Sequence, residues 1–92
     1  IIDRNLVPEI YWFKENKMKR YYVDCYIKSL NKCIEVKSIY TEQLGGDDIF
    51  LKQKSVCNSG YICEIWVYSN GIRIYIWICD ENNNIKKIYD IY

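Results

Sequence analysis

The sequence contains no histidine, no alanine and a single proline, and its cysteines form no CxxC pair. Without histidine, catalysis by an imidazole is excluded, and the cysteine spacing argues against a structural zinc site. The cysteines are Cys25, Cys33, Cys57, Cys63 and Cys79. An odd set without paired spacing favours buried free thiols, which predict a reducing, intracellular compartment.

The sequence also has almost no net charge and no long apolar run. Thirteen basic residues stand against twelve acidic ones, so a polyanionic partner must be bound by local patches. No apolar stretch approaches the ~20 residues of a membrane span, and we expect no membrane partner. Half of the 92 residues are apolar, enough for one core. Because the chain begins at Ile1 rather than Met, we interpret residues 1–92 as a single domain from a longer chain.

Alternating β-branched and aromatic residues predict strands in the first forty positions. Residues 9–15 and 19–27 read as a hairpin with a turn at Asn16 and Lys17, and residues 33–38 as a third strand. Within that third strand, alternation sets Cys, Glu and Lys on one face and Ile, Val and Ser on the other.

The pattern changes over residues 40–60, where we expect one main helix. Asp47 and Asp48 suit a helix start, and Gly60 suits its end. Residues 61–68 then form an apolar strand, and the Asn70-Gly71 pair is a strong hairpin signal leading to a further strand.

The order of these segments predicts an α/β (α+β) fold with a mixed central sheet of five to six strands. The sixth strand is a weaker prediction over residues 85–92. The main helix connects the third and fourth strands, so the fourth can lie parallel to an earlier one. The apolar strands 62–67 and 72–79 would favour a homodimer if their edges are uncovered.

Asp24, Glu35 and Lys37 are the candidate catalytic residues. Glu35 and Lys37 share a face because side chains two apart on a strand point the same way. Asp24 joins them only if the loop before the third strand has an even number of residues, such as 30–31 or 29–32. An odd loop sends Asp24 to the other face.

Two carboxylates that face each other repel unless a cation lies between them. Hard oxygen ligands suit Mg²⁺, with Mn²⁺ as a substitute, and we predict Asp24, Glu35 and the carbonyl of Val36 as metal ligands. Lys37 can orient the attacking water or stabilise charge on a phosphate. The alternative is an exposed strand face with alternating charges.

The segment YYVDCYI followed by NKCIEVKS resembles the PD-(D/E)xK superfamily. More closely, RYYVDCYIKSLNKCIEVKS, LKQKSVCNSGY and EIWVY resemble the restriction-endonuclease-like proteins of large DNA viruses with AT-rich genomes, over residues 7–68. The resemblance implies a restriction-endonuclease-like core and a magnesium-dependent DNA endonuclease that acts in a virus-infected host cell. Two features depart from the family: Val23 replaces its proline, and its N-terminal helix has almost no room before Pro8.

Basic and polar side chains outside this triplet are candidate nucleic-acid contacts. They are Lys14, Lys17, Lys19 and Arg20 around the first hairpin, and Lys52, Gln53 and Lys54 on the helix. The cations can hold a DNA backbone, or they can form an ordinary solvated surface. A second function class therefore stays open: a non-catalytic β-rich module that binds nucleic acid or protein.

Overall fold

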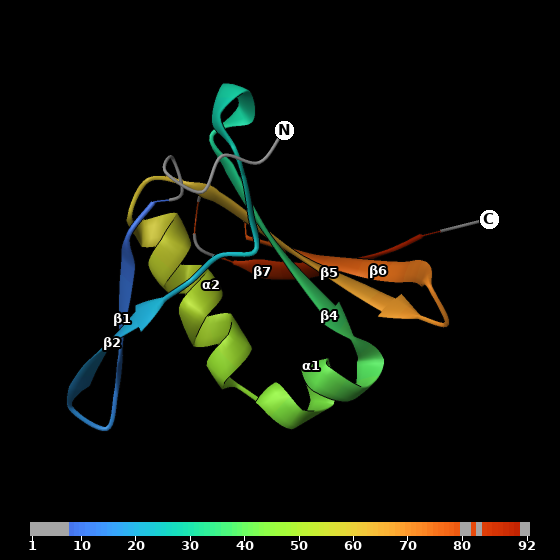
Figure 1. Ribbon diagram of the computed structural model, residues 1–92, viewed down its shortest axis with the longest axis horizontal. Helices are drawn as coiled ribbons and strands as arrows, with labels where there is room; N and C mark the ends of the chain where they lie inside the picture. The colour runs from blue at the N-terminus through green and yellow to red at the C-terminus, as the bar shows by residue number, and fades with distance from the viewer. Residues whose placement is uncertain (1–7, 80–81, 83, 91–92) are drawn as a thin grey trace.

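A two-stranded hairpin, two helices and a five-stranded sheet make up the computed structural model, which describes residues 8–79, 82 and 84–90 (Figure 1). In chain order the elements are β1 (Ile10–Lys14), β2 (Lys17–Tyr21), β3 (Cys25–Ile27), the 3-10 turn η2 (Lys28–Leu30), β4 (Lys32–Ser38), α1 (Ile39–Gly45), α2 (Asp48–Asn58), β5 (Ile62–Ser69), β6 (Ile72–Cys79) and β7 (Ile85–Tyr89).

The main sheet has the order β3-β4-β5-β6-β7. Strands β4 and β5 are parallel, and every other neighbouring pair is antiparallel. Parallel neighbours need a crossover rather than a tight turn, and α1 and α2 provide it. The predicted mixed α+β sheet with a helical connection between its central strands is therefore confirmed.

Two helices form where the sequence pattern predicted one. Ser38 caps α1 through a reciprocal capping box with Thr41, a local signal that the strand prediction for residues 33–38 obscured. The break follows at Gly46, whose positive φ of 55° suits glycine. A side chain at Gly45 would meet the Cγ2 atom of Ile49 at 2.6 Å, so the two helices pack closely here.

The predicted strand over residues 19–27 is wrong as a single element. Its first part belongs to β2, which pairs only with β1, while its last three residues form β3 on the main sheet. The chain changes sheets at residues 22–24. The hairpin turn also lies one residue earlier than predicted, at Glu15 and Asn16, both with positive φ.

Helix α2 lies between the hairpin and the sheet (Figure 1). Its buried positions Ile49, Gln53 and Val56 follow helical spacing and face inward. Val56 packs with Trp12 of the hairpin and Cys63 of β5, whereas Ile49 belongs to a second cluster further along the sheet. The helix therefore joins the hairpin to the sheet through one buried face, on which Gln53 separates the apolar Ile49 and Val56.

The edges on which the homodimer prediction rested are paired. Strand β5 lies between β4 and β6, and β6 lies between β5 and β7, so neither exposes an edge. The edge strands of the described sheet are the short β3 and β7 instead. Residues 91 and 92 of the predicted last strand lie outside the described residues.

The five cysteines are free thiols, of which Cys33 and Cys63 are buried. Within the described ranges, no helix is long and apolar enough to cross a membrane.

Gln53 is the buried polar residue that links α2 to the sheet. Its Nε2 atom donates to the carbonyls of Cys63 and Trp77, both at 3.1 Å. We expect Gln53→Leu to lower the free energy of unfolding by about 1–3 kcal/mol, because a buried carbonyl left without a donor is costly. Denaturant unfolding measures this. The neighbouring exposed Lys54→Leu is the control and should change stability by less than about 0.5 kcal/mol; equal effects would contradict the assigned role.

Candidate functional site

The register of β3 on β4 places Asp24 opposite Glu35. Cys25 pairs with Ile34 and Ile27 with Lys32, so the connecting loop is residues 28–31 and has an even number of residues. The loop begins one position before the longer predicted alternative and two before the shorter one, but the parity is the required one. Extended by one residue beyond its first pair, the register brings Asp24, which directly precedes β3, level with Glu35.

Just before β3 begins, the Asp24 side chain takes the place of a main-chain partner for β4. Its Oδ2 atom accepts a hydrogen bond of 2.9 Å from the backbone N–H of Val36. The N–H and C=O of one strand residue point to the same neighbour, so the Val36 carbonyl is directed toward this same edge of β4. The predicted oxygen donors from Asp24 and Val36 therefore lie on one side of the strand.

Glu35 lies at the margin of the core, with only 12% of its side chain exposed. Its Oε2 atom accepts a hydrogen bond of 2.5 Å from the Tyr21 hydroxyl, and its Oε1 atom is 3.6 Å from Lys37 Nζ. Burial raises the pKa of Glu35, and the charge of Asp24 raises it further. The Tyr21 hydrogen bond and Lys37 lower this pKa but do not cancel the rise.

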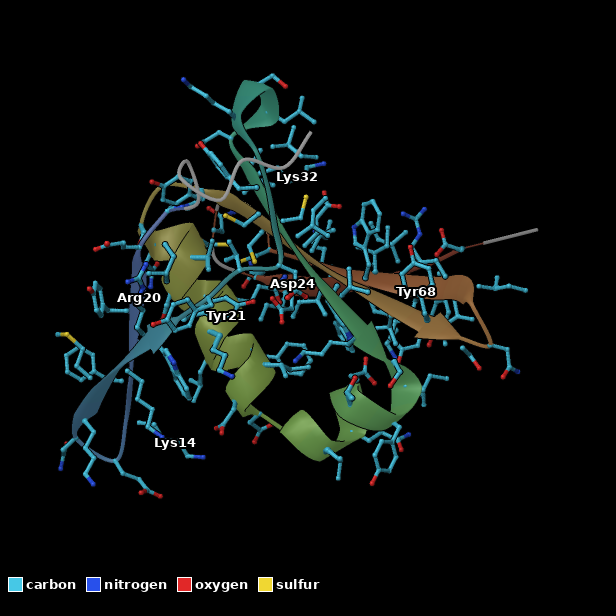
Figure 2. The ribbon with its side chains drawn as sticks, viewed as in Figure 1. Lys14, Arg20, Tyr21, Asp24, Lys32 and Tyr68 are labelled. Carbon is cyan, nitrogen blue, oxygen red and sulfur yellow. The ribbon has the colours of Figure 1, made fainter. Side chains whose placement is uncertain are left out.

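Tyr21 is a site residue that the sequence did not reveal. It ends β2, is 8% exposed, and points its hydroxyl at Glu35. Burial raises its pKa, with further contributions from Glu35 and Asp24, so the hydroxyl stays protonated as a donor. Figure 2 shows Tyr21 beside α2 and Asp24 beside β4. Nothing in the sequence separates Tyr21 from its neighbour Tyr22, which is 69% exposed.

The donor set fits a hard divalent cation with an open coordination sphere. Asp24 and Glu35 supply carboxylates, and Val36 supplies a carbonyl. Across the described part of the chain, no three His, Cys, Asp or Glu side chains gather to hold a metal. Mg²⁺ needs only one or two protein carboxylates besides water and substrate phosphate, so these residues suit Mg²⁺ and do not suit a closed structural site.

Three of the predicted basic residues meet beside Glu35. Lys19, Arg20 and Lys52 line a pocket of about 430 Å³, together with Trp12, Tyr21, Tyr22 and Glu35. The pocket therefore joins the hairpin, α2 and β4, which are distant in sequence.

The other predicted contacts lie elsewhere. Lys14 pairs with Asp48 at 2.6 Å, Lys17 is exposed beside the hairpin turn, and Lys54 is exposed on α2. Gln53 is 1% exposed and bonded to two carbonyls. A buried amide cannot contact a phosphate without opening the core, so we remove Gln53 from the candidate contacts.

The sequence is similar to that of a viral protein. Uncharacterized protein 273R of Invertebrate iridescent virus 6 is 35% identical over 80 residues, which cover 76% of this chain and 57% of the relative. The chain thus spans little more than half of that relative's length. No family model matches the sequence, and no solved structure matches it. The name of this relative states no activity, so the similarity does not indicate a function, and the function is inferred from the site.

The environment of Glu35 predicts that two substitutions will shift the pKa of its carboxyl group in opposite directions. We expect Tyr21→Phe to raise the pKa of Glu35, because it removes a hydrogen bond to the ionised form, and Asp24→Asn to lower it, because it removes a neighbouring negative charge. An NMR titration that follows the Glu35 side-chain carbonyl carbon measures both shifts. Tyr26→Phe, whose hydroxyl bonds Asn31, is the control. Shifts of the same sign in the two variants would contradict this arrangement.

Proposed function

We propose that this chain is a metal-dependent nuclease domain that hydrolyses DNA phosphodiester bonds, with Asp24, Glu35 and Lys37 as its catalytic residues. The observation that carries the proposal is the β3–β4 register, which sets Asp24 opposite Glu35 and leaves Lys37 on the same face. Adjacent carboxylates beside a lysine are a donor set suited to a divalent cation and a phosphate.

Each residue has a separate task in this proposal. Asp24 and Glu35 hold Mg²⁺ or Mn²⁺ with the Val36 carbonyl, and Tyr21 orients the Glu35 carboxylate. When bound, the cation supplies charge neutralisation at the phosphate and a water of lowered pKa. Lys37, whose Nζ lies 3.6 Å from Glu35 Oε1, orients the attacking water or stabilises charge on the phosphate.

The fold supports the finer assignment of a restriction-endonuclease-like core. An acidic residue at a strand end, the Glu35–Lys37 pair on the next strand, and a helical crossover to a parallel strand occur in the order that the resemblance implies. Five free thiols and a viral relative support a setting in the reducing interior of a virus-infected host cell.

A second candidate function rests on the outer face of the hairpin. Tyr11, Phe13 and Met18 are exposed there, at 48%, 63% and 61%. Clustered exposed apolar side chains mark interaction surfaces, so a non-catalytic module that binds nucleic acid or protein is the alternative. It predicts binding that does not respond to Mg²⁺ and that survives Glu35→Gln.

Metal binding tests the site without knowledge of the substrate. We expect Mn²⁺ to bind the wild type in a calorimetric titration, and Glu35→Gln to weaken this binding by roughly tenfold or more. Because burial raises the pKa of Glu35, affinity should fall as the pH is lowered through that raised pKa, where protons compete with the metal. Glu64→Gln, which alters a carboxylate on the opposite sheet face, should leave binding unchanged. Equal isotherms for wild type and Glu35→Gln would overturn the metal site.

Substitution of Lys37 tests the catalytic role separately from metal binding. We expect Lys37→Ala to reduce DNA cleavage by about 10²-fold or more while the fold and Mn²⁺ binding persist, because charge stabilisation at the phosphate is lost. Cleavage of plasmid DNA with Mg²⁺, followed on gels, measures this. Lys32→Ala is the matched control, since Lys32 starts the same strand, lies an odd number of residues from Lys37 and so points to the other face, and pairs with Glu64. A Lys37→Ala variant that cuts at the parent rate would remove Lys37 from the mechanism.

A further inference from the structure

The pocket beside Glu35 has a composition that the cleavage chemistry does not require. Its walls carry three aromatic rings, from Trp12, Tyr21 and Tyr22, and three cations, against the single carboxylate of Glu35. Metal binding and phosphate hydrolysis use none of the ring faces. Trp12 and Tyr21 are buried core residues, whereas Tyr22 is exposed, so the pocket suits a ligand that brings negative charge to the cations and a flat π-surface to Tyr22.

The cations already lie over these rings. Lys52 Nζ is 5.1 Å from the centre of the Trp12 ring and 5.7 Å from that of Tyr21, and Lys19 Nζ is 5.7 Å from Trp12. Neither lysine forms an ion pair within the described chain. These two cations are held at the pocket by ring contacts rather than by carboxylates, which leaves their charge available to an anion.

Tyr22 is the most exposed of the three aromatic side chains that line the pocket. Its side chain is 69% exposed, and the Arg20 guanidinium lies 4.7 Å from its centre. An aromatic side chain this exposed, at the rim of a cationic pocket, can stack on a nucleobase while the neighbouring cations hold the backbone. In a continuous duplex the base faces are already stacked on each other, so only a base that has left the stack can use this ring.

We propose that the pocket binds one unpaired nucleotide, with its base on Tyr22 and its phosphate near Lys19 and Lys52. Resting on the proposed nuclease function, the substrate is then DNA with a single-stranded or bulged nucleotide beside the bond to be cut. Continuous duplex is disfavoured because it presents phosphates but no free base face. A pocket of about 430 Å³ is within the size range of small-molecule sites.

Binding without metal tests this inference separately from cleavage. In EDTA, fluorescence anisotropy compares a labelled single strand, the matched duplex, and that duplex with one bulged nucleotide. We expect the single-stranded and bulged ligands to bind more tightly than the duplex, and Tyr22→Ala to weaken their binding about tenfold. Tyr11→Ala is the matched control, because Tyr11 is exposed on the same hairpin but does not line the pocket.

A second pair of variants tests the phosphate contact. Lys52→Ala should reduce the slope of log affinity against log salt by about 0.7, the value for one phosphate of a single strand, whereas the exposed Lys54→Ala should not. Equal affinity for duplex and single strand, equal effects of Tyr22→Ala and Tyr11→Ala, or no binding to any of the three would overturn the inference. Failure of the nuclease proposal appears differently, as absence of cleavage with Mg²⁺ while the binding preference persists.

Discussion

The parallel pairing of β4 with β5 is the constraint on which the rest of the structure depends. Parallel neighbours cannot be joined by a tight turn, so the chain leaves the sheet after Ser38 and returns at Ile62. The crossover lays α2 against one sheet face, and Val56 of α2 provides the apolar surface on which Trp12 of the hairpin packs. Among the described residues the hairpin shares no strand pairing with the main sheet, so it is placed by packing against the helix and the sheet and by the Tyr21–Glu35 hydrogen bond.

The electrostatics of the candidate site follow from the same packing. Cys33, Glu35 and Lys37 alternate along one face of β4, from the buried core outward to partial exposure. Glu35 is thus desolvated beside Asp24, and its pKa is raised. A carboxylate with a raised pKa favours the fold when protonated, and that stabilisation is lost as pH rises through the raised value. A cation held between the two carboxylates would offset this loss near neutral pH.

Local signals in the sequence were sufficient where geometry is local. Asn70 and Gly71 adopt positive φ values of 52° and 77°, as the predicted hairpin requires. The prediction of one strand over residues 19–27 was wrong because β propensity does not specify a pairing partner, and the chain changes sheets after Tyr21. The predicted main helix corresponds to α2, whereas α1 was missed because Ser38 ends a strand and caps a helix at once. Asp24 shares a face with Glu35 only if the loop before β4 has an even number of residues, and the β3–β4 register meets this condition.

The sequence by itself determined the mixed α+β class, the order of the central strands along the chain, and the shared face of Glu35 and Lys37. These follow from side-chain periodicity, which each strand carries alone. Only the tertiary structure decided that Asp24 lies opposite Glu35, that Tyr21 rather than Tyr22 bonds it, and that Lys52 lines the pocket while Gln53 is buried. Those outcomes depend on register and on packing between distant segments, which neighbouring residues do not encode.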